Sequence, residues 1–285
     1  MPISNSPKPI LFLHGFWHGS WCWADVLARV TGAGARALAV DMAGHGLLAR
    51  RPEALTRRPF DPGLLATEVS PVADVDLDQA GDLLVSQLEQ LAGGNPVVVV
   101  AHSMGGAVLS RAAQLAPELV AHAVYLTAFM PASGVPSVAY PQLPENEGSL
   151  TDAAFVADPA VIGALRIDVA SGDPAYRQRL RAALYGDIDP AAADAAIALL
   201  TPDAPAGIAL GATTLTQGGW GSVPRTYVRC TQDFTIRPAL QQKFIADADA
   251  AFPANLTLVH TLDSSHSPFL SMPGQVADIA LKLIH

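Results

Sequence analysis

The sequence predicts an α/β fold, a mostly parallel sheet covered by helices on both faces with a helical cap inserted in it. Strand-like and helix-like runs alternate at both ends of the chain, which is typical of a parallel sheet. Residues 131–222 are instead rich in Ala, Pro and Asp and carry short helical pieces. A chain of 285 residues can bury a sizeable core. We therefore expect a core of residues 1–130 and 223–285, with residues 131–222 as the inserted cap.

The first core segment contains alternating apolar runs and amphipathic runs. Four consecutive valines after Pro96 suit a strand that is buried on both faces. Ser20 is a candidate cap for the first helix, and Gly93 and Pro117 are expected to end the next two. The predicted strands are 10–13, 36–40, 96–100 and 121–126, and the predicted helices are 20–30, 77–91 and 104–116.

The α/β pattern is interrupted by the predicted cap and then returns. Two cap helices, at 174–184 and 190–200, each open with proline at a suitable first helical position. Beyond the cap we expect strands at 225–230 and 256–259 and helices at 238–248 and 274–283. Residues 43–75 also stand out, because they contain four prolines and are long for a connection in a compact domain. They are expected to be functional or mobile.

Composition excludes several function classes. The formal charge of −9 argues against general nucleic-acid binding and against a polybasic membrane anchor. Two cysteines, Cys22 and Cys230, are too few for a disulfide framework or a zinc knuckle. Residues 1–9 contain no apolar region of a signal peptide, and no apolar run reaches spanning length. We expect a cytoplasmic protein that acts on a small molecule, without nucleic acid, membrane, metal or cofactor; its oligomeric state is not predicted.

The strongest chemical signal is a serine between the valine-rich strand and the following helix. In Ala101-His102-Ser103-Met104-Gly105, small residues flank the serine two positions away on either side. This context predicts a nucleophile elbow, a sharp turn that lifts the hydroxyl above the sheet and strains the backbone of Ser103. Ala101 departs from the glycine usual at its position, but a single methyl group is commonly tolerated there.

A serine nucleophile needs a base that is oriented by an acid. Such partners follow later strands in the order Ser, acid, His. His266 follows the last predicted strand, and Asp233 follows the strand 225–230. Asp263 is the rival acid, but it lies only three residues before His266 and is better suited to bracing that loop.

Acyl transfer also needs two donors for the developing oxyanion. The backbone N–H of Met104 follows the nucleophile, and Phe16 lies in the loop after the first strand. His14 and His18 have a spacing that two metal ligands could have, but no carboxylate cluster lies nearby in sequence. We interpret His14 as a histidine that fixes the loop and His45 as a turn residue.

The chain resembles the α/β-hydrolases, and among them the plant methylesterase and hydroxynitrile lyase group with its bacterial esterase relatives. The resemblance covers both core segments, is weak in the cap and is absent over residues 47–75. It implies an α/β-hydrolase fold with Ser103 as nucleophile, His266 as base, Asp233 as acid, and Phe16 and Met104 as oxyanion donors. The matching stretches are His14–Trp23, Ala101–Gly106, Leu126–Pro131 and Val223–Asp233.

Departures from the family pattern narrow the set of activities expected for this chain. The lyases of this group need a threonine after the first motif histidine and a lysine after the catalytic histidine, where this chain has Gly15 and Ser267. This argues against cyanohydrin cleavage. Haloalkane dehalogenases and epoxide hydrolases of this fold place Asp where this chain has Ser103.

The predicted function is hydrolysis of a carboxylic ester or lactone of a small hydrophobic substrate through an acyl-enzyme. The alternatives are a cyclase, lyase or thioesterase of secondary metabolism on the same triad, or a ligand-binding protein that has lost turnover. The exposed cationic run of Arg50, Arg51, Arg57 and Arg58 is interpreted as a solvated face, with binding of an anionic substrate group as the alternative. Candidate pocket residues, each equally compatible with core packing, are Trp17, His18, Phe129, Met130 and Trp220.

Overall fold

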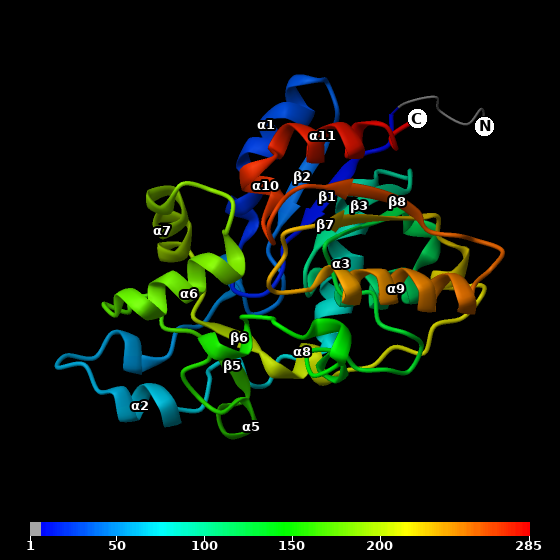
Figure 1. Cartoon of the computed structure of the whole chain (residues 1–285). Coiled ribbons are helices and arrows are strands. Elements are labelled where there is room, and N and C mark those ends of the chain that lie inside the picture. Colours follow the sequence, from blue (N-terminus) through cyan, green and yellow to red (C-terminus); the bar gives the residue numbers. More distant parts are fainter. Residues whose placement is uncertain (1–6) are drawn as a thin grey trace.

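The structure is a computed structural model that describes residues 7–285, and its centre is a parallel sheet of six strands (Figure 1). The strand order is β2-β1-β3-β4-β7-β8, and every neighbouring pair runs parallel. All carboxyl ends therefore meet at one edge of the sheet. The strands are β1 (Ile10–Leu13), β2 (Ala37–Val40), β3 (Val97–His102), β4 (Val120–Leu126), β7 (Arg225–Cys230) and β8 (Leu258–Leu262).

Helices cover both faces of the sheet. Alternate residues of β3 point to opposite sides, so Val98 packs with α1 and α11 whereas Val99 packs with α3 and α4. Figure 1 shows α1 and α11 together on one side and α3 and α9 on the other. The core helices are α1 (Ala24–Gly32), α3 (Leu77–Ala92), α4 (Gly105–Leu115), α9 (Pro238–Ala251), α10 (Pro268–Ser271) and α11 (Pro273–Leu281). The predicted parallel sheet with helices on both faces is confirmed.

Residues 131–222, called the insertion below, connect β4 to β7 and contribute most of the residues around Ser103 at the carboxyl end of the sheet. They contain a two-stranded antiparallel sheet that the sequence did not predict, because its strands have only three residues each. Its regular elements are α5 (Pro159–Ile162), β5 (Ala164–Arg166), α6 (Pro174–Leu184), α7 (Pro190–Ala198), β6 (Asp203–Pro205) and α8 (Ala206–Leu210). Asp173 and Asp189 cap α6 and α7, each directly before the proline that opens the helix.

The unusual stretch 43–75 packs against this insertion. It contains α2 (Pro62–Thr67) and two short 3₁₀ turns, and Figure 1 shows it beside α5, β5 and β6. Arg166 of β5 donates hydrogen bonds to the carbonyl oxygens of Leu65 (2.7 Å) and Glu68 (3.0 Å). These carbonyls are among those that a helix leaves unpaired at its end. The guanidinium thus fixes the end of α2.

Two expectations about the elements are wrong. The region after Gly19 opens with a 3₁₀ turn, Ser20–Trp23, before α1, and the Ser20 side chain makes no cap hydrogen bond. The last strand is Leu258–Leu262, two to three residues later than predicted, because this edge strand is mostly solvent-exposed and includes polar residues. Gly93 does end α3, in the left-handed conformation at φ 54°.

Within residues 7–285, no helix combines the length and the apolar character needed to cross a membrane. The interpretation that residues 1–9 carry no signal-peptide region falls mainly on residues 1–6, outside the described residues. Cys22 and Cys230 are both free, buried thiols.

Candidate active site

Ser103 lies on a sharp turn between β3 and α4. Its φ of 52° falls in the left-handed region, which a residue with a side chain rarely adopts. The turn requires small neighbours: a Cβ on Gly106 would lie 2.2 Å from the Phe129 carbonyl oxygen, and one on Gly105 2.5 Å from that of His14. This is the geometry of a nucleophile elbow, with the hydroxyl raised above the carboxyl ends of the strands.

The structure brings Ser103, His266 and Asp233 together from the ends of three strands. The Ser103 hydroxyl donates to Nε2 of His266 at 3.0 Å, and Nδ1–H of His266 donates to Oδ2 of Asp233 at 2.8 Å. Asp233 is fully buried and His266 is 1% exposed. The carboxylate therefore selects the tautomer that leaves Nε2 free to accept the serine proton.

Asp233 is held by four hydrogen-bond donors. Its Oδ1 accepts the backbone N–H groups of Thr235 (2.6 Å) and Ile236 (2.9 Å). Its Oδ2 accepts the hydroxyl of Thr127 (2.5 Å) as well as His266. Thr127, which sequence reasoning did not assign a role, has φ 37° just after β4. Its place in the family-like stretch Leu126–Pro131 was the available signal.

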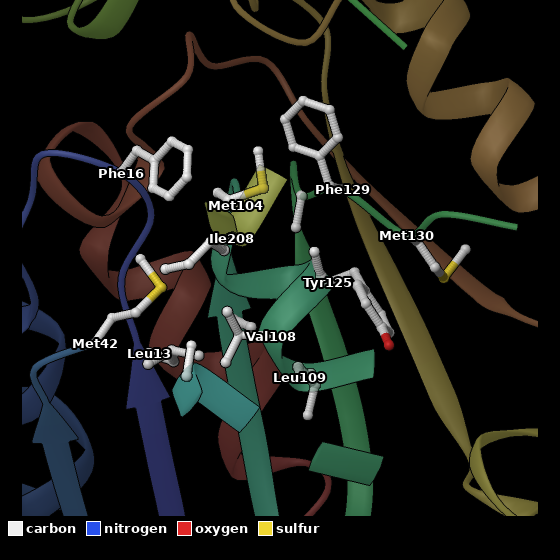
Figure 2. Close-up of a cluster of buried hydrophobic side chains, with 14 of the residues drawn as sticks. Leu13, Phe16, Met42, Met104, Val108, Leu109, Tyr125, Phe129, Met130 and Ile208 are labelled. Carbon is white, nitrogen blue, oxygen red and sulfur yellow. The ribbon is translucent and has the colours of Figure 1, made fainter. Parts of the chain in front are cut away.

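Two backbone N–H groups near Ser103 are candidates for an oxyanion hole. Among residues 7–285, neither the N–H of Phe16 nor that of Met104 has a hydrogen-bond acceptor. Phe16 lies in the loop after β1, and Met104 stands at the N-terminus of α4, whose dipole favours negative charge. The side chains of Phe16, Met104 and Phe129 lie close together at the end of the buried cluster in Figure 2. Unpaired donors beside a nucleophile suit a developing oxyanion.

Buried neutral histidines surround this site. Burial lowers the pKa of His14 to about 3 and that of His45 to about 4. His14 accepts the backbone N–H of Met42 at 3.0 Å, which fixes the loop as expected. His45 is fully buried and stacks on the Phe16 ring at 5.6 Å, so it does more than form a turn. His102, another residue without a predicted role, donates from Nε2 to the His266 carbonyl oxygen at 2.7 Å.

The metal alternative for His14 and His18 gains no support from the geometry. Nδ1 of His18 donates to the Phe16 carbonyl oxygen at 2.9 Å, and Nε2 accepts the Tyr185 hydroxyl at 2.8 Å. Both ring nitrogens are thus occupied. Within the described part of the chain, no three His, Cys, Asp or Glu side chains are placed to hold a metal ion.

A cavity of about 520 Å³ opens over Ser103. The core contributes six lining residues and the insertion contributes the rest. Among its lining residues the cavity has two carboxylates, Asp152 and Asp158, and no Lys or Arg. Lining residues used below are Phe16, Trp17, Phe129, Phe155, Leu165 and Leu210.

The predicted pocket residues divide into two groups. Trp17 and Phe129 line the cavity. His18, Met130 and Trp220 do not, which corrects their assignment: His18 is bonded within its loop, and Met130 is 1% exposed, off to one side in Figure 2. Trp220 is a core residue, since its indole N–H donates to the Tyr125 hydroxyl at 2.6 Å beneath the guanidinium of Arg225.

Neither the rival acid Asp263 nor the arginine run of the stretch 43–75 lies where its alternative role would need it. Asp263 accepts hydrogen bonds from Thr231 and Gln232, so it braces its loop, as expected, and does not orient His266. None of the four arginines of the stretch 43–75 lines the cavity. They are solvent-exposed, at positions 50, 51, 57 and 58, and Arg50 pairs with Asp74 at 3.3 Å.

Comparison with known proteins identifies the family of the chain. A sequence profile of the Alpha/beta hydrolase family matches residues 10–279. Methylesterase 9 of Arabidopsis thaliana is 26% identical over 283 residues, covering 97% of this chain and 98% of the relative. Esterase PIR7B of Oryza sativa subsp. japonica is 28% identical over 291 residues, covering 98% and 97%.

Solved structures share the fold. A pyrethroid hydrolase from Sphingobium faniae aligns with a TM-score of 0.72 at 23% identity, over 98% of each chain. Polyneuridine aldehyde esterase aligns with a TM-score of 0.72 at 20% identity, over 98% of this chain and 99% of that one. The esterase relatives confirm the prediction of a carboxylic ester hydrolase. The chain belongs to the alpha/beta hydrolase family, with the plant methylesterases among its relatives.

Proposed function

We propose that the protein hydrolyses a carboxylic ester or lactone of a small, neutral, hydrophobic substrate through an acyl-enzyme on Ser103. The observation that carries the proposal is the continuous hydrogen-bond chain from Ser103 through His266 to Asp233. Each link lies within the range that proton transfer requires. Names of the relatives as methylesterases and esterases support the same reaction class.

The reaction runs in two halves. His266 accepts the Ser103 proton as Oγ attacks the carbonyl carbon, and Asp233 stabilises the imidazolium that forms. The N–H groups of Phe16 and Met104 hold the oxyanion. His266 then protonates the departing alcohol oxygen, and a water molecule releases the acyl group by the same route.

The cavity supports the substrate class. Its aromatic and aliphatic lining, including Phe129, Phe155 and Leu210, favours burial of an apolar group. With Asp152 and Asp158 in the lining and no Lys or Arg, an anionic group would be repelled there. A neutral ester therefore fits better than an acidic one.

The decisive experiment is intact-mass analysis after treatment with a fluorophosphonate, followed by peptide mapping. We expect one adduct on Ser103, none on Ser103→Ala, and turnover of neutral aryl and alkyl esters by the wild type only. A folded wild type without an adduct would contradict the proposal and favour the ligand-binding alternative. An adduct on Ser103 with ester substrates rearranged or cleaved without uptake of water would favour the cyclase or lyase alternative.

A further inference from the structure

One short segment of the insertion contacts all three loops that carry the proposed chemistry. Residues 183–187, at the end of α6 and beyond it, are called the tie segment here. It forms a hydrogen bond with one residue of each loop: Thr235, two residues after the acid; His18, two residues after Phe16; and Ser265, directly before the base. These three partners come from different parts of the core, so one segment links them.

The first tie reaches the oxyanion loop. The Tyr185 hydroxyl donates to Nε2 of His18 at 2.8 Å, and Nδ1–H of His18 donates to the Phe16 carbonyl oxygen at 2.9 Å. Tyr185 and His18 are each 1% exposed. Without the Tyr185 hydroxyl, Nε2 of His18 would be a buried acceptor without a partner, and the imidazole would lose one of the two hydrogen bonds that hold it.

The second tie reaches the loop of the base. Asp187 accepts hydrogen bonds from the Ser264 hydroxyl (2.8 Å), the Ser265 N–H (3.0 Å) and the Ser265 hydroxyl. Burial alone would raise the pKa of Asp187, but the serine hydrogen bonds outweigh burial and lower it. A carboxylate thus holds the two residues that precede His266, although it does not touch the imidazole.

The third tie reaches the acid. The Thr235 hydroxyl donates to the Ala183 carbonyl oxygen at 2.8 Å, while the Thr235 N–H donates to Asp233. Because a carbonyl of the main chain accepts this bond, it depends on where the segment lies and not on which side chain residue 183 carries. Tyr185 and Asp187 are the two side chains through which the segment can be tested.

We propose that Tyr185 and Asp187 are positioning residues, through which the tie segment holds the oxyanion loop and the His266 loop in register for catalysis. The inference rests on the proposed function for its chemical consequence. Neither residue lines the cavity, so neither is expected to contribute to ground-state substrate binding. A misplacement of one loop by about 1 Å lowers turnover up to a hundredfold.

The test uses full-length Tyr185→Phe and Asp187→Asn, which remove few atoms and retain the packing. The matched control for the tyrosine is Tyr176→Phe. Tyr176 is likewise buried and lies on α6, and within residues 7–285 its hydroxyl bonds only inside the insertion, to Ala154 and Asp168. The control for the carboxylate is Asp194→Asn, which pairs with Arg177 and Arg181 on α6.

We expect kcat for a neutral aryl ester to fall tenfold to a hundredfold in the two test variants, with KM changed less than threefold. The rate of fluorophosphonate labelling of Ser103 should fall in parallel. Hydrogen–deuterium exchange should rise in residues 14–18 for Tyr185→Phe and in residues 263–267 for Asp187→Asn. Both controls should keep kcat and the exchange of these loops, whatever their thermal midpoints do.

Each outcome decides something. Unchanged exchange in the test variants would overturn the inference, and so would kcat losses in the controls that match those in the test variants. Faster exchange with unchanged labelling would show that the ties order the loops without serving catalysis, which refutes the catalytic part. An unlabelled wild type would defeat the proposed function instead, while the exchange measurement would still decide whether the segment holds the loops.

Discussion

The buried ion pair between Arg166 and Asp203 offers a quantitative test of how the insertion is held. The two residues face each other in the β5–β6 ladder. Nε and Nη2 of Arg166 each lie 2.7 Å from a carboxylate oxygen of Asp203, and both side chains are fully buried. The perturbations are Arg166→Met and Asp203→Leu, each alone and both combined.

The expected cost follows from what each variant leaves behind. Arg166→Met leaves a buried carboxylate without its partner, which typically costs about 3–5 kcal/mol. It also leaves the carbonyl oxygens of Leu65 and Glu68 without their donor. The double variant removes the carboxylate as well, so only the two carbonyls remain unpaired, at about 1–3 kcal/mol each. The double variant should therefore be more stable than Arg166→Met.

Urea unfolding followed by far-UV circular dichroism and tryptophan fluorescence measures these free energies, provided the two probes coincide. Trypsin cleavage after Arg57 reports separately on the stretch that leads into α2, which Arg166 holds at its end. If the two single substitutions add to the double variant within about 0.5 kcal/mol, the pair is not coupled and the reasoning fails. It also fails if Arg166→Met costs less than about 1 kcal/mol.

Three further predictions concern the site. Asp233→Asn should leave the protein folded and lower kcat by about 10³-fold to 10⁴-fold, because the amide favours the wrong imidazole tautomer. A loss under tenfold in steady-state kinetics would contradict this. Gly15→Ala places a Cβ 2.5 Å from the Cβ of Ser103, so ester turnover and labelling should both be lost; a fully active variant would refute the close packing. The free energy of unfolding should fall as pH drops from about 6.5 towards 4. Burial lowers the folded-state pKa values of His14, His18 and His45 below those of the unfolded chain, so the unfolded state binds protons first. Urea midpoints that are constant over this range would contradict the neutral burial of His14, His18 and His45.

The core could be predicted because its strands are short, apolar and flanked by residues that stop helices. Strands 10–13 and 225–230 have the predicted bounds, and so does helix 174–184 of the insertion. The bounds predicted for β8 were two to three residues too early, because four of the five residues of this edge strand are exposed and two of those, His260 and Thr261, are polar. The pair β5–β6 was missed because three-residue strands have no periodicity to detect.

Some residues of the candidate site could likewise be predicted from the sequence, and others could not. Ser103, Asp233 and His266 could be predicted because each follows a strand, and parallel strands bring their carboxyl ends to one edge. Tyr185 and Asp187 could not, since their contacts depend on how the insertion folds back over that edge, which local pattern does not encode. Trp220 was misassigned for a related reason: an aromatic residue near a motif is as compatible with the core as with the cavity.

The placement of charge explains why one histidine among several can act as the base. Burial holds the pKa of His14, His18 and His45 at about 3 or 4, and lowers that of His102 well below its usual value. Within residues 7–285, the Asp233 carboxylate pairs with His266 alone among these imidazoles. The neutral rings can therefore orient the loops by hydrogen bonds without competing for the serine proton. A positive charge formed on His266 is stabilised by the one carboxylate that touches it, so the position of Asp233, and not the number of imidazoles, selects the base.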